Sequence, residues 1–138
     1  DVAILAALQQ HRVELICLAG YMKRLGAATL AAYRGRILNI HPALLPKFGG
    51  KGFYGEAVHR AVLAAGERES GATVHLVDEE YDRGPVLAQR RVPVRLGDTP
   101  DTLAARVLEE EHILYAETLQ KIACGQIRLQ DFGSRVGG

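Results

Sequence analysis

The sequence lacks the features that mark membrane, secreted and nucleic-acid-binding proteins. No apolar run comes near the roughly 20 residues that a membrane-spanning helix needs, and the first residues show no basic region followed by an apolar core and a cleavage site. The net charge is only +1, and Lys and Arg are scattered along the chain, so we expect no nucleic-acid surface. With 138 residues, 48% of them hydrophobic, the composition predicts a single globular domain over residues 1–138.

Residues with obvious chemistry are also scarce. The two cysteines, Cys17 and Cys124, lie far apart within apolar segments, which predicts two buried free thiols in a reducing, cytoplasmic setting. No group of His and Cys has the spacing of a zinc site, so we expect no metal. The segment GGKG (49–52) lacks the spacing and the following Ser or Thr of a phosphate-binding loop. No nucleophilic Ser or Cys occupies a recognisable nucleophile elbow.

Apolar runs of strand length alternate with helical patterns through most of the chain. This alternation predicts an α/β fold whose first strands are parallel. The strands expected at 71–80 and 84–94 are separated by a turn rather than a helix, so we expect them to pair antiparallel in a mixed sheet. The other expected elements are strands at 13–21, 36–41 and 126–130, helices at 2–10, 26–35, 55–67 and 98–125 (the last with Asp98 or Thr99 as its N-cap), and a flexible tail at 131–138.

Polar residues follow three of the expected strands. LAGYMKRL comes after the first strand, NIHPALLP after the second and VDEEYD after the third. In open α/β sheets, ligands bind beyond the carboxyl ends of the strands. We therefore expect these three segments to lie along one edge of the sheet and to form a site there.

Asn39 and His41 are the strongest catalytic candidates at this edge. They are two residues apart, which on a strand places both side chains on one face. An amide N–H beside an imidazolium is a suitable donor pair for an oxyanion that develops at a carbonyl, and a His near a carboxylate can act as general acid or base. The available carboxylates are those of Asp78, Glu79, Glu80 and Asp82.

A structural interpretation of the same residues stays open. A single His at the end of a strand is more often a hydrogen-bonded structural residue, and an acidic turn such as 78–82 is more often a solvated loop or a weak cation site. We expect His75 and His112 to be packed or capping residues, and His11 and His59 to lie on the surface. From the residues alone, the catalytic interpretation of the amide and imidazole pair is the less common one.

Longer segments of the sequence resemble one enzyme family. LAGYMKRL, LNIHPALLPKF, SGATVHLVDEEYDRGPVLAQ and VPVRLGDTPDTLAARVLEEEH follow the order and spacing of the folate-dependent phosphoribosylglycinamide formyltransferases of purine synthesis. The resemblance runs from about Val13 to Leu129, and Asn39, His41 and Asp82 match the family signature. It implies a formyltransferase-like α/β fold: an open, mostly parallel but mixed sheet flanked by helices, in a Rossmann-like domain truncated at its N-terminus.

The resemblance also implies a reaction between two small molecules. In this family the amine of glycinamide ribonucleotide attacks the formyl carbon of the co-substrate 10-formyltetrahydrofolate. His41 as imidazolium and Asn39 would stabilise the oxyanion, while Asp82 would raise the pKa of His41 and help to move protons. His75 would have a supporting role. The expected partners are these small molecules, with no nucleic acid and no membrane, and a homodimer is the expected assembly.

The same resemblance assigns binding residues. The folate would contact Asn39 and two loops, which comprise Met22, Lys23, Arg24 and Leu25, and Asp78, Glu79, Glu80, Tyr81 and Asp82. The ribonucleotide would face a helical segment, Leu108, Glu109, Glu110 and Glu111, with Glu111 placed to accept ribose hydroxyls.

One part of the family pattern has no counterpart here. In the family, a strand and a Gly-Ser-rich loop at a helix N-terminus come first and hold the substrate phosphate, whereas this sequence opens with DVAILAALQQH. We expect the chain to form the C-terminal two-thirds of the family's domain. Two alternatives stay open: a formyltetrahydrofolate deformylase, which uses the same Asn, His and Asp on water, and an inactive fragment that still binds folate. Pro42, directly after the His, favours the transferase over the deformylase.

Overall fold

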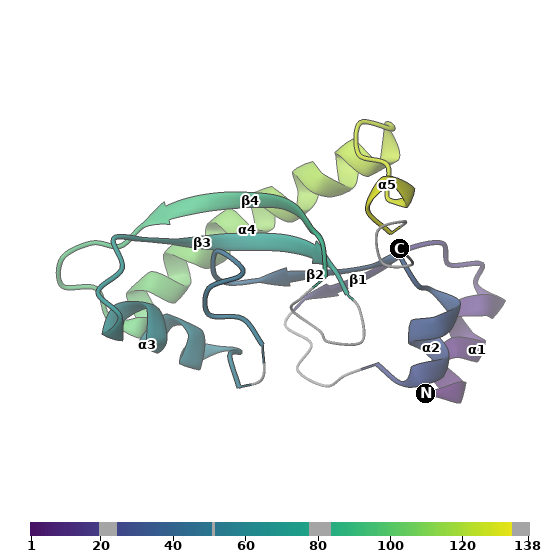
Figure 1. Cartoon of the computed structure of the whole chain (residues 1–138), viewed down its shortest axis with the longest axis horizontal. Coiled ribbons are helices and arrows are strands. Elements are labelled where there is room, and N and C mark those ends of the chain that lie inside the picture. Colours follow the sequence, from purple (N-terminus) through teal and green to yellow (C-terminus); the bar gives the residue numbers. More distant parts are fainter. Residues whose placement is uncertain (20–24, 51, 78–83, 134–138) are drawn as a thin grey trace.

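The computed structural model describes residues 1–19, 25–50, 52–77 and 84–133. Strands alternate with helices as far as β3, two strands then follow one another, and helices complete the described chain (Figure 1). The elements are α1 (Val2–Gln10), β1 (Ile16–Ala19), α2 (Ala27–Ala32), β2 (Ile37–His41), α3 (Glu56–Ala64), β3 (Glu69–Leu76), β4 (Val86–Pro93), α4 (Pro100–Ala123) and α5 (Gln130–Gly133).

The strands form one four-stranded sheet in the order β1-β2-β3-β4. β1 and β2 run parallel, whereas β3 pairs antiparallel with both β2 and β4. The expected mixed sheet, in which β3 and β4 pair antiparallel, is therefore confirmed. The register places Asn39 opposite His75 and His41 opposite Thr73, which brings four polar side chains together at the centre of the sheet.

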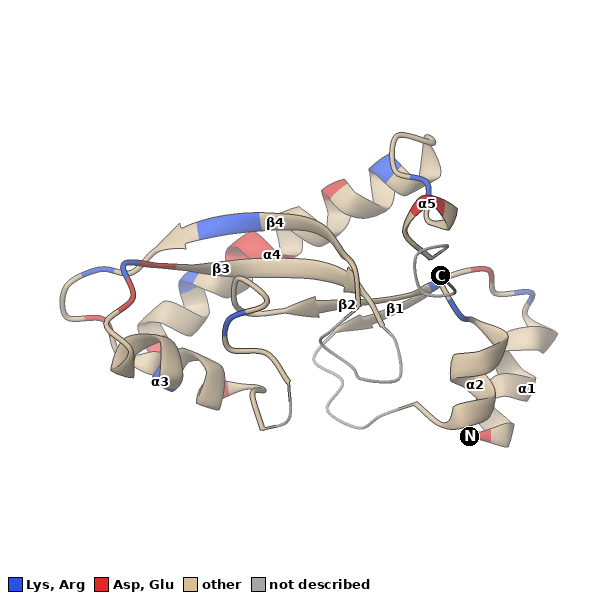
Figure 2. Cartoon of the chain, viewed as in Figure 1, with Lys and Arg blue, Asp and Glu red and all other residues tan. Residues whose placement is uncertain are grey.

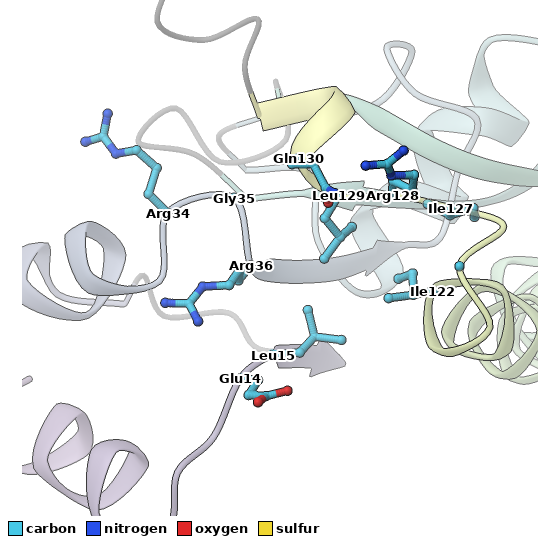
Figure 3. Close-up of a pocket in the computed structure, with 11 residues that line it drawn as sticks. Glu14, Leu15, Arg34, Gly35, Arg36, Ile122, Ile127, Arg128, Leu129 and Gln130 are labelled. Carbon is cyan, nitrogen blue, oxygen red and sulfur yellow. The ribbon is translucent and has the colours of Figure 1, made fainter.

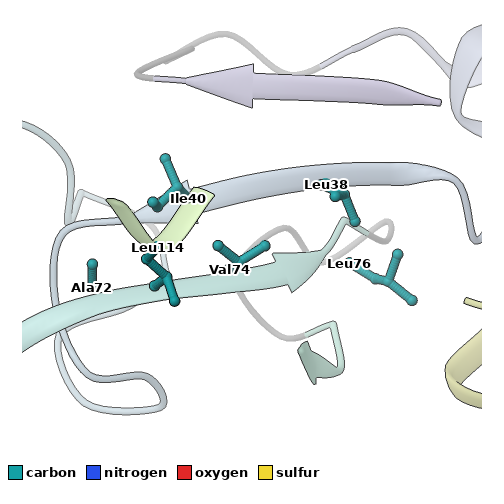
Figure 4. Packing of buried hydrophobic residues seen from close by; sticks show 6 residues of the cluster. All are labelled: Leu38, Ile40, Ala72, Val74, Leu76 and Leu114. Carbon is teal, nitrogen blue, oxygen red and sulfur yellow. The ribbon is translucent and has the colours of Figure 1, made fainter. Parts of the chain in front are cut away.

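Apolar residues on the opposite face of the sheet pack against α4. Leu38 and Ile40 of β2 form a buried cluster with Val74 and Leu76 of β3 and with Leu114 of α4 (Figure 4). None of these five residues is more than 6% exposed. Because side chains alternate along a strand, this packing leaves the intervening residues of β2 on the other face.

Two smaller clusters attach the other helices. Val62 of α3 packs with Val92 of β4 and with Leu103 and Val107 of α4. At the β1 edge, where α1 and α2 lie side by side (Figure 1), a second cluster consists of Leu18, Tyr33, Ile37 and Val77, with partly buried residues such as Leu5, Leu8 and Leu25 around it.

The N-terminus of α4 is capped by side chains. The hydroxyl of Thr99 accepts a hydrogen bond from the Thr102 N–H, and Pro100 occupies the first turn. Of the two expected N-cap residues, Thr99 is therefore the N-cap and Asp98 is not. Asp98 instead accepts hydrogen bonds from Arg106, at 2.8 and 2.9 Å, and from the Arg95 N–H. The Arg106 guanidinium is the main cause that lowers the pKa of Asp98 well below its usual value, and the Arg95 N–H adds to it.

Charged residues connect β4 with the outer surface of α4. Arg90 of β4 forms ion pairs with Glu110 and with Glu117 of α4. Figure 2 shows basic positions on β4 and acidic positions on α4 beside it. Although α4 is 24 residues long, none of the helices in the described part of the chain is both long and apolar enough to cross a membrane.

The expected strand at 126–130 is wrong. The N–H groups of Gln126 and Ile127 both donate to the carbonyl of Lys121, at 2.9 and 3.1 Å, so they close the C-terminus of α4 instead of pairing with a strand. Leu129 then packs against the main core, and the chain continues into the short helix α5. Satisfying the end of a long helix therefore outweighs the strand propensity of this segment.

The expected burial of the two cysteines is also wrong. Both thiols are free, but Cys17 and Cys124 are exposed. Cys17 lies on β1, which is an outer strand of the described sheet and has only one buried residue, Leu18. Cys124 is the C-cap of α4. An apolar sequence context did not reveal that one residue lies at a sheet edge and the other at a helix end.

Candidate active site

β2 places Asn39 and His41 together on the sheet face opposite α4. Their neighbours Leu38 and Ile40 point into the main core, so alternation directs the two polar side chains the other way. Asn39 is 5% exposed and His41 is 3% exposed. The apolar and the polar residues of this strand are thus equally buried, and the polar ones need hydrogen-bond partners.

Asn39 is held by the histidine across from it on β3. The Asn39 Nδ2 lies 3.3 Å from Nε2 of His75, which is fully buried, and the His75 Nδ1 lies 3.1 Å from the carbonyl oxygen of Leu76. Oδ1 of Asn39 is buried and has no hydrogen-bond partner in the described part of the chain. Because buried polar atoms are nearly always paired, this oxygen marks a position where a ligand or water is expected.

His41 is oriented by the loop that follows it. Its Nε2 lies 2.6 Å from the carbonyl oxygen of Phe48, and because a carbonyl only accepts, Nε2 is the donor. The loop is held in turn by Thr73, which lies opposite His41: its hydroxyl donates to the Ala43 carbonyl at 2.7 Å and accepts from the Leu45 N–H at 3.1 Å. The turn away from the sheet is therefore supported by a buried side chain of β3.

The carboxyl end of β3 lies at a different edge of the sheet from the one predicted. β3 is antiparallel to β2, so its carboxyl end at Leu76 lies opposite Leu38, and the Val77 N–H donates to the carbonyl of Ile37. The rule that placed three carboxyl ends along one edge is therefore wrong for β3. Asp78, Glu79, Glu80, Tyr81 and Asp82, like Met22, Lys23 and Arg24, lie outside the described residues.

The flanks of these two segments nevertheless meet. Leu25, which follows residues 20–24, and Val77, which precedes residues 78–83, both belong to the cluster around Leu18 and Ile37. Leu18 pairs with Asn39 in the parallel register. Both segments thus connect to the sheet at one cluster, next to the strand that carries Asn39.

The four predicted residues of α4 have different surroundings. Leu108 and Glu109 are exposed, and Glu110 is engaged by Arg90. Glu111 is partly buried and makes no ion pair with any described residue. Burial raises the pKa of Glu111 to about 7, as expected for a carboxylate without a compensating charge. Of the four, only Glu111 combines partial burial with the lack of an ion pair to another described residue.

His59 is a buried residue that the sequence analysis placed on the surface. It lies on α3 between the buried residues Val58 and Val62, is 5% exposed, and its Nδ1 is buried without a partner among the described residues. Burial, and then the charge of His41, lower its pKa, while Glu56 opposes the shift. The helical spacing of the apolar residues of α3 could have revealed this inward position.

The amino ends of β1 and β2 form a separate groove. It has a volume of about 1090 Å³ and is lined by residues from the ends of β1, α2 and α4, among them Arg36, Ile122 and Arg128 (Figure 3). None of the predicted site residues lines this groove. Within residues 1–19, 25–50, 52–77 and 84–133, no group of three His, Cys, Asp or Glu side chains could hold a metal ion.

Comparison with protein families shows to which family the chain belongs. Residues 1–119 match the family described as Formyl transferase. The chain belongs to the formyl transferase family. Its mixed sheet, flanked by helices, is the fold of this family's solved structures.

Relatives within the family carry one recurring name. The chain is 53% identical over 115 residues to the chloroplastic phosphoribosylglycinamide formyltransferase of Vigna unguiculata, covering 83% of this chain and 37% of the relative. It is 36% identical over 138 residues to phosphoribosylglycinamide formyltransferase of Escherichia coli, covering 100% of this chain and 63% of the relative. The chain therefore spans less than two-thirds of the length of these relatives.

Solved structures of the family agree with the fold. Phosphoribosylglycinamide formyltransferase from Brucella melitensis is 54% identical, with a TM-score of 0.78 over 91% of this chain and 62% of that one. A formyltetrahydrofolate deformylase from Pseudomonas syringae is 26% identical, with a TM-score of 0.79 over 94% of this chain and 40% of that one. The fold alone does not separate transfer to an amine from transfer to water.

Proposed function

We propose that this chain is the part of a phosphoribosylglycinamide formyltransferase that carries the reaction centre, and that the protein transfers the formyl group of 10-formyltetrahydrofolate to the amine of glycinamide ribonucleotide in purine synthesis. The observation that carries the proposal is that Asn39 and His41 lie together on one buried face of β2. The chain's relatives bear this enzyme's name. Two donors at one strand end suit a carbonyl that gains negative charge.

The reaction proceeds in two bond changes. The lone pair of the amine nitrogen forms a bond to the formyl carbon, and the carbonyl π electrons move onto the formyl oxygen. The C–N bond to the folate then breaks, N10 of the folate takes a proton, and the amine loses one, so that a formamide and tetrahydrofolate result. His41 and Asn39 stabilise the oxyanion between these steps, and Asp82 holds the charge on His41 and relays the protons.

The binding assignments are those that the family resemblance implies. The folate contacts Met22, Lys23, Arg24, Leu25 and Asn39, and the loop Asp78, Glu79, Glu80, Tyr81 and Asp82 closes over it. The shared cluster at Leu25 and Val77 supports a common ligand for both loops. The ribonucleotide lies along Leu108 to Glu111, with Glu111 as acceptor for ribose hydroxyls. We place the protein in the cytoplasm, although plant relatives are named chloroplastic, and propose a homodimer.

Substitution of the three signature residues tests the proposal. In the full-length protein, His41→Ala, Asn39→Ala and Asp82→Ala should each lower formyl transfer by on the order of 10² or more, because each removes stabilisation made only in the transition state. Formation of the formylated ribonucleotide is the measured quantity. His112→Ala, at an exposed position of α4, is the control and should retain the wild-type rate. Wild-type rates in all three site variants would refute the assignment.

Hydrolysis of the folate is the second candidate function. The structural match to a formyltetrahydrofolate deformylase favours it, because the same donors could act on water. The two functions differ when glycinamide ribonucleotide is left out of the assay. A transferase releases formate slowly or not at all under these conditions, whereas a deformylase releases it at the full rate.

A further inference from the structure

Asn39, His75 and the Leu76 carbonyl form a short hydrogen-bonded chain. Two distances define it: 3.3 Å from the Asn39 Nδ2 to the His75 Nε2, and 3.1 Å from the His75 Nδ1 to the Leu76 oxygen. His75 is 0% exposed and faces Asn39 directly across the β2–β3 pairing. Both ring nitrogens therefore have a partner in the protein.

The backbone carbonyl decides which nitrogen of His75 carries the hydrogen. A carbonyl oxygen can only accept, so the Nδ1 must donate to Leu76. In a neutral imidazole the other nitrogen is then an acceptor. Nε2 of His75 consequently takes a hydrogen from the only donor of the Asn39 side chain, its Nδ2 amide group.

This chain also fixes the orientation of the Asn39 amide. With Nδ2 directed at His75, Oδ1 is left as a buried acceptor without a partner in the described chain. A buried acceptor of this kind destabilises the protein unless something pairs with it. An N–H or O–H donor of a bound molecule is the group that would satisfy it.

We propose that His75 is a positioning residue that holds Asn39 with Oδ1 as a hydrogen-bond acceptor for an N–H of the attacking amine. The second hydrogen of the Asn39 Nδ2 is then the one that faces the formyl oxygen. A single amide contacts both reacting molecules: it accepts from the amine and donates to the carbonyl. The tautomer and the amide orientation stand on the geometry alone, whereas the identity of the donor as an amine rests on the proposed function.

Nitrogen NMR of the full-length protein tests the positioning role without any activity. In a ¹⁵N-labelled sample near neutral pH, the ring of His75 should be protonated at Nδ1 and bare at Nε2, and a coupling through the hydrogen bond should connect Nε2 to the Asn39 Nδ2. The ring nitrogen signals are assigned by through-bond correlations from the backbone, and the His75 signals should disappear in His75→Gln. If that variant does not fold, His11→Gln and His112→Gln identify the signals that belong to those other histidines. A ring protonated at Nε2, alone or together with Nδ1, would overturn the proposal.

A double-substitution cycle in the full-length protein tests the consequence for the reaction. His75→Leu should lower kcat about as much as Asn39→Ala, that is by on the order of 10², and should leave KM for the folate nearly unchanged. The double variant should be no slower than Asn39→Ala alone, because the two residues act as one unit. Losses that multiply would show that His75 acts only through the fold and would overturn its positioning role. An inactive wild-type protein would instead count against the proposed function and leave the NMR result standing.

Discussion

The two faces of β2 are equally buried but differ in how their groups are satisfied. On one face, Leu38 and Ile40 fill the main core against α4. On the other, Asn39 and His41 form specific hydrogen bonds to His75 and to the Phe48 carbonyl, and one buried oxygen has no partner among the described residues. Burial alone therefore does not distinguish core from site. The distinguishing feature is a buried polar atom that the protein itself leaves unpaired.

The largest expected contrast is in stability. Leu38→Ala should lower the free energy of unfolding by about 2–5 kcal/mol, because it removes a fully buried side chain and leaves a cavity. Asn39→Ala, one position along the same strand, should cost less: it removes the donor to His75, but also an Oδ1 that is already buried without a partner among the described residues. Urea unfolding followed by circular dichroism measures both. Equal losses would mean that the polar face is as much a part of the stabilising core as the apolar face.

A smaller effect is expected where the site is attached to the fold. Thr73→Val should destabilise the protein by about 1–3 kcal/mol, because it removes the hydroxyl that bonds the Ala43 carbonyl and the Leu45 N–H. Thr118→Val is the matched control. Thr118 is just as buried, but its hydroxyl bonds only the Leu114 carbonyl within α4. If both variants melt at the same temperature, the loop after His41 does not depend on Thr73.

The pH dependence of stability should reveal Glu111. Its pKa is raised from 4.5 to about 7 by burial, so the folded state holds this proton more tightly than the unfolded state does. Its effect is therefore a loss of stability as the pH rises between these two values. Glu111→Gln should remove this loss and should melt above the wild type at pH 8, with little difference at pH 4. Glu109→Gln, at an exposed position, should show neither change.

Asp98 should give a slope of the opposite sign. Its pKa is lowered from 3.8, chiefly by Arg106, so the unfolded state binds the proton more readily. This stabilisation is present above pH 3.8 and is lost as the pH falls through the lower pKa of the folded state. Asp98→Asn should lower the melting temperature at pH 7 and flatten the decline at acid pH. Asp101→Asn, also at the start of α4 but exposed, is the control. Parallel acid profiles for Asp98→Asn and the wild type would refute the role of this ion pair.

Local sequence patterns predicted most of the fold because they report local physics. The alternation of strands and helices, the antiparallel pairing of β3 with β4 and the cap at Thr99 all depend on residues close in sequence. The direction of β3 does not, since it depends on how distant strands pair. The same limit explains the wrong strand at 126–130, where the end of α4 decides the structure, and the wrong burial of Cys17, where the position of β1 in the sheet decides it.

The candidate site was predictable only in part. Two residues of one strand, Asn39 and His41, could be placed on one face from the period of a β-strand alone. The partner of Asn39, His75, lies 36 positions away, and no pattern connects them without the sheet register. His59 was missed because a polar residue on an amphipathic helix is usually exposed. The roles of Asp82 and the folate loops came from family resemblance, and they stay predictions.

The catalytic role of the polar face of β2 is the central claim, and one measurement tests it most directly. Formyl transfer to glycinamide ribonucleotide and thermal melting are measured together for the full-length wild type, His41→Ala and His112→Ala. We predict that His41→Ala loses activity by on the order of 10² or more while it stays folded at the assay temperature and binds the folate. A His41→Ala variant that transfers the formyl group at the wild-type rate would contradict the account.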